Sequence, residues 1–158
     1  MILLPGEATM YNDRDFVGRM SLPLVAVGER FTVGFGAEPQ LQVQRQMVDQ
    51  TRSTQGGNQV LKYDYRILVS SFKSEPVKLQ VWDRLPKGET ESVGVVLIKA
   101  TPDLCKDGIY LRESRPNNLL RWDVDVPANV SGEKAYAINY EFKMELDRQM
   151  AITGFQSK

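Results

Sequence analysis

Pairs of carboxylate side chains are the first candidates for a catalytic or metal-binding role in this chain. They alternate along two polar stretches: Asp123 with Asp125, and Glu141 with Glu145 and Asp147. Carboxylates two residues apart on a strand share a face and lie roughly 7 Å apart. That separation suits a glycosidase acid pair or a calcium site. Arg121 and Lys143 share these faces, so a solvated, charged strand face is the simpler interpretation.

Histidine is absent, and Cys105 is the only cysteine. Since histidine is the usual general base near neutral pH and the commonest metal ligand, Ser–His–Asp and Cys–His catalysis are excluded, as are zinc sites. We therefore expect no catalytic residue, no metal and no cofactor. Cys105 cannot form an internal disulfide and is interpreted as a buried, inert thiol, with a cross-link to another chain as the alternative.

Two charged residues fall in the apolar phase of their strands. Arg45 alternates with the apolar residues of 41–47, and Asp83 with those of 77–81. An inward charge is costly without a partner, so we hypothesise that Arg45 and Asp83 pair with each other, or each nearby, at the end of the core. Exposure of both at strand ends is the alternative.

Trp82 falls out of phase with the apolar residues of 77–81, so its side chain is expected to point outward. An outward tryptophan can contact a sugar or another protein, and cover by the following loop at 85–86 is the alternative. Arg45, Trp82, Asp83 and Arg84 form the candidate surface or structural polar site.

Alternating segments separated by turn residues must position these side chains. Strands are expected at 8–11, 16–20, 30–33, 41–48, 60–72, 77–83, 93–98, 120–126 and 135–148, with a mobile hairpin tip at 50–59 and one helical turn starting at Thr101–Pro102. The segment 135–148 is long, so we expect it to bend, bulge or project past the sheet, and a projecting end with Met144, Leu146 and Met150 would face a partner domain. About eight short strands and little helix predict an all-β fold, an antiparallel β-sandwich of the immunoglobulin-like kind.

Length and charge limit the partners. The 158 residues suit a single domain over 1–158. Lysine plus arginine equals aspartate plus glutamate at 20 each, so no net field attracts nucleic acid. No apolar run approaches the roughly 20 residues that cross a bilayer, so we expect no direct membrane insertion.

The order of several motifs resembles a known family. These motifs are Leu3-Leu4-Pro5-Gly6-Glu7-Ala8, Val81-Trp82-Asp83-Arg84-Leu85-Pro86 and Leu120-Arg121-Trp122-Asp123-Val124-Asp125-Val126-Pro127-Ala128. They resemble the C-terminal domain of the mucoidy-inhibitor-like family, a domain of unknown function. The resemblance implies a β-sandwich that is the last module of a longer bacterial protein, in the periplasm or cell envelope, without an assigned active site.

These observations favour a non-catalytic interaction or assembly module. Its expected partners are other domains of the parent protein or an envelope protein, and self-association is left open. The alternatives are a carbohydrate-binding module that uses Trp82 and, third, a carboxylate-based hydrolase.

Overall fold

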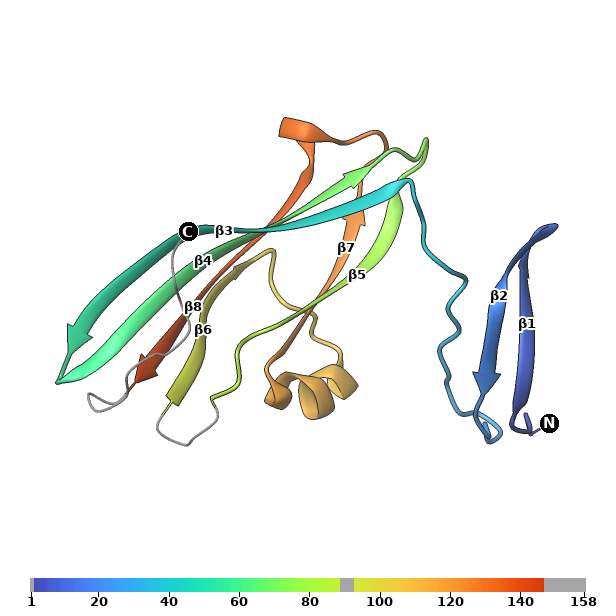
Figure 1. Ribbon diagram of the computed structural model, residues 1–158, viewed down its shortest axis with the longest axis horizontal. Helices are drawn as coiled ribbons and strands as arrows, with labels where there is room; N and C mark the ends of the chain where they lie inside the picture. The colour runs from blue at the N-terminus through green and yellow to red at the C-terminus, as the bar shows by residue number, and fades with distance from the viewer. Residues whose placement is uncertain (1, 89–92, 147–158) are drawn as a thin grey trace. The chain divides into compact units, whose positions relative to one another are not determined.

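The computed structural model describes residues 2–88 and 93–146, and the chain divides into two compact units. One unit covers Met1–Pro39 and the other Gln40–Lys158. Figure 1 labels the strands of both units. Each unit is described by itself, and the single domain expected over 1–158 stays a prediction.

The smaller unit contains one antiparallel hairpin, whose strands include both segments predicted at 8–11 and 16–20. Strand β1 (Gly6–Asn12) pairs with β2 (Asp15–Leu22). Asp13 takes a φ of 55° in the turn, a conformation that aspartate tolerates better than most residues. The rings of Tyr11 and Phe16 meet edge to face beside the turn, with their centroids 6.0 Å apart.

The strand expected at 30–33 does not form, so that prediction is wrong. A strand requires backbone partners on a neighbouring strand, and none of the described residues pairs with 30–33. Alternation over four residues indicated a strand, but it could not show whether a partner was within reach.

The larger unit consists of two antiparallel sheets. Four strands form one sheet in the order β3 (Leu41–Gln55), β4 (Asn58–Ser71), β8 (Tyr136–Leu146) and β6 (Val93–Thr101). Two strands, β5 (Val77–Arg84) and β7 (Leu119–Val126), form the other. Figure 1 shows β5 and β7 crossing one face of the four-stranded sheet, which we call its inner face.

The hydrophobic core lies between these two sheets. It is built from alternate residues of β4, β8 and β7, and its fully buried members include Val69, Leu120, Trp122, Val126 and Ile138. Tyr63 and Phe142 stack across β4 and β8 with their ring centroids 5.0 Å apart. The all-β antiparallel sandwich-like fold is thereby confirmed, whereas an immunoglobulin-like strand order stays a prediction.

The hairpin of β3 and β4 is longer than the sequence indicated. The polar stretch 50–59 was expected to be a mobile tip, but its ends are strand and only Gly56 and Gly57 form the turn. Both glycines have positive φ, at 60° and 93°, as a two-residue hairpin turn requires. Backbone pairing with β4 therefore holds a segment that has no apolar side chain.

Strand β6, which contains the strand predicted at 93–98, is an irregular edge strand of the four-stranded sheet. A register shift between Leu97 and Lys99 leaves Ile98, which is 45% exposed, without a partner residue in β8. The helical turn expected at Thr101–Pro102 is wrong, because the turns η1 (Tyr110–Ser114) and η2 (Arg115–Asn117) come later. The Asp107 carboxylate accepts hydrogen bonds from the backbone N–H groups of Ile109 and Tyr110 at 3.1 and 3.0 Å, and so caps that segment. The short turn η3 (Gly132–Lys134) precedes β8.

Strand β8 begins at Tyr136, one residue after the start of the expected segment 135–148, and is described as far as Leu146. The register shift opposite it lies in β6. Leu146 is buried and Met144 is half-buried, so these two side chains do not form an exposed projecting end. Positions 147–148 and Met150 lie outside the described residues.

Candidate functional site

A polar network joins the two sheets at the margin of the core. Arg45 on β3 lies 2.8 Å from Asp83 on β5, measured from Nε to Oδ2. The hydroxyl of Tyr140 on β8 donates to the same Oδ2 atom at 2.6 Å and accepts from the Arg45 guanidinium at 2.8 Å. The predicted pairing of Arg45 with Asp83 is confirmed, and Tyr140 is a third member that the sequence analysis missed.

The pKa values of both Arg45 and Tyr140 are raised in this network. The Arg45 guanidinium stacks on the Tyr65 ring, with Cζ 3.8 Å from the ring centroid. Burial lowers the pKa of Arg45, but its hydrogen bonds to Tyr140 and Asp83 outweigh burial and leave the pKa raised. Burial, and next the hydrogen bond to Asp83, raise the pKa of Tyr140 strongly. At neutral pH, Arg45 therefore stays charged and Tyr140 stays a neutral hydrogen-bond donor. We call Arg45, Asp83 and Tyr140 together the clasp, because their bonds join the two sheets.

Beside this clasp, the described part of the larger unit, taken by itself, leaves one margin of the sandwich uncovered. Val43 and Met47 lie on the inner face of β3, because they pair with Val69 and Tyr65 of β4, but they are 61% and 54% exposed. The two-stranded sheet is too narrow to cover all four strands of its partner, since each strand adds only about 4.8 Å of width.

Two strand edges flank this opening. Strand β3 is an edge of the four-stranded sheet, and β5 pairs only with β7 among the described strands. Strand β7 contacts β8, where Trp122 packs on Tyr140. Strand β5 contacts β3 through Asp83 and Arg45. The edge of β5 that does not pair with β7 therefore lies on the β3 side. Val43, Met47 and the edges of β3 and β5 are together called the open side.

The other two members of the predicted polar site point away from the clasp. Trp82 lies on the outward face of β5 and is 46% exposed. It contacts Tyr110 edge to face, with centroids 5.9 Å apart, and the Arg121 guanidinium lies 5.5 Å from its ring centroid. Arg84 is exposed, and its backbone N–H donates to Asp83 Oδ1 at 2.7 Å. The four predicted residues therefore do not form one site: Arg45 and Asp83 pair between the two sheets, whereas Trp82 and Arg84 lie on the outward face of β5.

A second polar cluster lies on the outward face of the two-stranded sheet. The Arg121 guanidinium donates to both carboxylate oxygens of Asp123 at 2.8 Å, and the Cys105 thiol donates to Asp123 Oδ2 at 3.0 Å. This hydrogen bond, and next desolvation, raise the pKa of Cys105, while the bonds from Arg121 and next Cys105 lower the pKa of Asp123. Cys105 is half-buried rather than fully buried, and the raised pKa keeps its thiol in the less reactive form. The sequence suggested no such cluster, because a loop brings Cys105 to β7.

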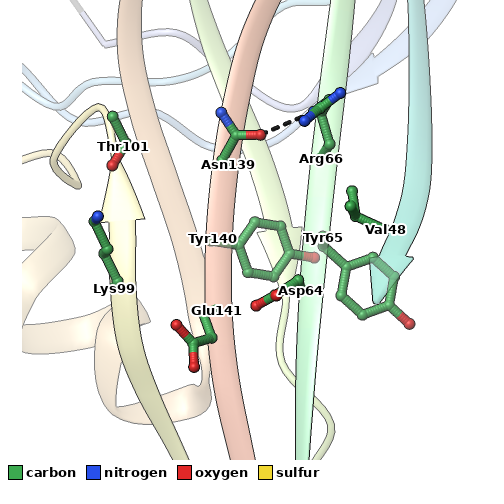
Figure 2. A pocket seen from close by; sticks show the side chains of 9 residues that line it. All are labelled: Val48, Asp64, Tyr65, Arg66, Lys99, Thr101, Asn139, Tyr140 and Glu141. Carbon is green, nitrogen blue, oxygen red and sulfur yellow. Dashed lines mark hydrogen bonds between the residues drawn. The ribbon is translucent and has the colours of Figure 1, made fainter. Parts of the chain in front are cut away.

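The outer face of the four-stranded sheet carries a hollow of about 340 Å³. Figure 2 shows the side chains from four strands that surround it. Arg66 donates to Asn139 Oδ1 at 3.0 Å across β4 and β8. The lining residues are Val48 from β3, Asp64, Tyr65 and Arg66 from β4, Lys99 and Thr101 from β6, and Asn139, Tyr140 and Glu141 from β8.

Two carboxylates face each other in this hollow. Asp64 and Glu141 are directly opposed on β4 and β8, and Lys99 is opposed to Glu141 on the far side. A glycosidase acid requires an apolar, enclosed setting, whereas the side chains here are mostly charged or polar and half-buried or exposed. The hollow has the opposed carboxylates that a hydrolase would need but lacks that setting, so the hydrolase alternative gains no support from it.

The described part of the chain contains no group of three or more acidic or thiol side chains able to hold a metal ion. Residues 2–88 and 93–146 also contain no helix of the length and apolar character that crossing a membrane requires.

Comparison with known proteins gives one match. A family model described as "Domain of unknown function (DUF4139)" matches residues 5–146. No curated protein and no solved structure matches the chain.

Proposed function

We propose that this chain, which belongs to the family described as a domain of unknown function (DUF4139), is a non-catalytic interaction module that binds an extended polypeptide strand at its open side. The observation that carries the proposal is the exposure of Val43 and Met47 on a sheet face that is otherwise core. Apolar side chains on such a face are normally covered by a neighbouring element.

A polypeptide strand fits the open side better than a small molecule does. Among the described strands, β3 and β5 each have one edge without a neighbour, and the backbone N–H and C=O groups of such an edge can pair with an added strand. Alternate side chains of that strand would point toward Val43 and Met47 and complete the core. The Arg45–Asp83–Tyr140 clasp supports this role, because it holds the two edges at a constant separation before the partner arrives.

Site-specific photo-cross-linking in the cell of origin tests the proposal. p-Benzoylphenylalanine in place of Val43 or Met47 should yield a cross-linked polypeptide, whereas the same residue in place of Val96 should not. Val96 is a matched control because it is 50% exposed and lies on the opposite edge strand β6. Equal cross-linking from all three positions, or none from positions 43 and 47, would contradict the proposal.

We also propose the finer placement that the sequence resemblance implies. The chain would be the C-terminal module of a longer bacterial protein of the mucoidy-inhibitor-like family, in the periplasm or cell envelope, and its partner would be another domain of that protein or an envelope protein. Sequencing the full reading frame and fractionating its product by compartment tests this placement. A cytoplasmic product would contradict it.

Carbohydrate binding is the second candidate, favoured by the exposed ring of Trp82. Gln80 and Asp123 share its face and could hydrogen-bond sugar hydroxyls while the ring stacks on a sugar. Binding to a polysaccharide array should then disappear in Trp82→Ala and persist in Phe72→Ala, which removes another half-exposed aromatic side chain. An absence of binding to any polysaccharide would remove this candidate.

A further inference from the structure

We infer that the hollow on the outer face of the four-stranded sheet binds a zwitterionic amino compound, whose ammonium group lies between Asp64 and Glu141 and whose carboxylate faces Arg66. A free α-amino acid is the simplest member of this class. The hollow lies on the face opposite Val43 and Met47. The inference therefore goes beyond the proposed strand binding and does not depend on it.

One wall of the hollow offers only hydrogen-bond acceptors. Asp64 and Glu141 are opposed on β4 and β8 and are half-buried. Within the described part of the chain, neither carboxylate forms an ion pair or accepts a hydrogen bond from a side chain. Directly opposed strand residues have Cβ atoms about 4.5–5.5 Å apart, and like charges at this separation repel. One ammonium group that donates to both carboxylates at about 2.8 Å spans this separation and offsets the repulsion.

The lysine in this row cannot neutralise both acids. Lys99 is opposed to Glu141 from the edge strand β6, and its side chain is exposed. On its other side, Asp64 is opposed to Asp49 of β3, so the row holds three carboxylates and one ammonium group. An added cation is therefore favoured at Asp64. A calcium ion fits less well, because it takes about six to eight oxygen ligands and the hollow is lined by two carboxylates.

The other wall of the hollow offers mainly hydrogen-bond donors. Arg66 Nε donates to Asn139 Oδ1 at 3.0 Å, which leaves the other guanidinium N–H groups and the Asn139 amide NH2 group as donors. Thr101 adds a hydroxyl group from β6. Figure 2 shows Arg66, Asn139 and Thr101 in one row, with Asp64 and Glu141 in the row below. A wall of N–H and O–H donors fits a carboxylate.

The spacing of the two rows and their charge fit an amino-acid head group. Residues two positions apart on one strand, such as Asp64 and Arg66, are separated by about 7 Å. A ligand held by both rows must therefore place its ammonium and carboxylate groups close together, as an α-amino acid does. The charged side chains that line the hollow, Asp64, Arg66, Lys99 and Glu141, sum to zero. A ligand without net charge is therefore favoured over a polyamine or a polyanion.

NMR titration of the isotope-labelled full chain with glycine tests this inference. Glycine should shift the amide resonances of residues 64–66, 99–101 and 139–141, with a dissociation constant on the order of millimolar for so small a ligand. Methylamine and acetate each carry one of the two charges, so each should bind at least about fivefold more weakly than glycine. No shift at the hollow, or equal binding of glycine and methylamine, would overturn the inference.

Two variants separate the two walls of the hollow. Asp64→Asn should weaken the binding of both glycine and methylamine about fivefold, because it removes a negative charge beside the ammonium group. Arg66→Gln should weaken glycine binding by a similar factor without weakening methylamine binding. The matched controls Asp125→Asn and Arg84→Gln alter exposed residues of the two-stranded sheet and should change neither. Equal effects of Asp64→Asn and Asp125→Asn on glycine binding would contradict the assignment.

Discussion

Replacing Asp83 with alanine should destabilise the larger unit mainly through Tyr140 rather than through Arg45. Asp83 accepts a hydrogen bond from the buried Tyr140 hydroxyl at 2.6 Å and one from Arg45 Nε at 2.8 Å. A hydrogen bond to a charged group contributes about 1.5–3 kcal/mol. The Arg45 side chain is 42% exposed, so its ion pair with Asp83 is screened by water and contributes about 0.2–1 kcal/mol.

Together these contributions predict a loss of about 3 kcal/mol of unfolding free energy for Asp83→Ala. The backbone N–H of Arg84, which also donates to Asp83, is on an exposed residue and can bond to water instead. Asp125→Ala is the matched control, because it removes an exposed aspartate from the neighbouring strand β7. It should change the unfolding free energy by less than about 0.5 kcal/mol.

Urea unfolding followed by tryptophan fluorescence measures these values, since Trp122 is fully buried against Tyr140. Double-mutant cycles then separate the two interactions. Asp83→Ala with Tyr140→Phe should give a coupling energy of about 1.5–3 kcal/mol, and Asp83→Ala with Arg45→Met one below about 1 kcal/mol. A larger coupling for the arginine pair than for the tyrosine pair would refute the reasoning.

Three other predictions concern pH, the thiol and the core. The pKa of Tyr140 in the folded protein is raised above its unfolded value near 10. The contribution of Tyr140 to the unfolding free energy is therefore complete below about pH 10 and falls by about 1.4 kcal/mol per pH unit above pH 10. In urea unfolding at a series of pH values, Tyr140→Phe should reduce this fall in stability. The Cys105 thiol, whose pKa is raised by its hydrogen bond to Asp123, should react slowly with Ellman's reagent at pH 8 and severalfold faster in Asp123→Asn, and an equal acceleration in Asp125→Asn would contradict this. Trp122→Ala should cost about 3–5 kcal/mol, because it empties a fully buried site and removes the donor to the Pro102 carbonyl; circular dichroism during urea unfolding measures this.

Most strands of the larger unit were predictable because one face of each is core and the other is solvent. The period of two placed Leu120, Trp122 and Val124 on one face, and the structure buries all three. The same period identified Arg45 and Asp83 as inward charges that needed partners, and their pairing follows from the cost of an unpaired charge near the core. The period of two also predicted that the Trp82 side chain points outward.

Segments without a hydrophobic period were not predictable from the sequence. The ends of 50–59 are strand only because β3 and β4 pair backbone to backbone, and side-chain patterns do not record such pairing. The helical turns after Gly108 depend on capping by the Asp107 side chain. The segment 30–33 alternates like a strand but has no neighbouring strand among the described residues.

By itself, the sequence determined the all-β class, the face to which most side chains point, and the absence of histidine chemistry, because these depend on residue type and local period. Only the tertiary structure decided which strands are neighbours and which are edges. It brought Tyr140 to Asp83 across 57 residues of chain, and within the described part of the larger unit it left Val43 and Met47 exposed beside two strand edges without a neighbouring strand. These features arise from contacts between distant segments, and they carry the proposed interaction site.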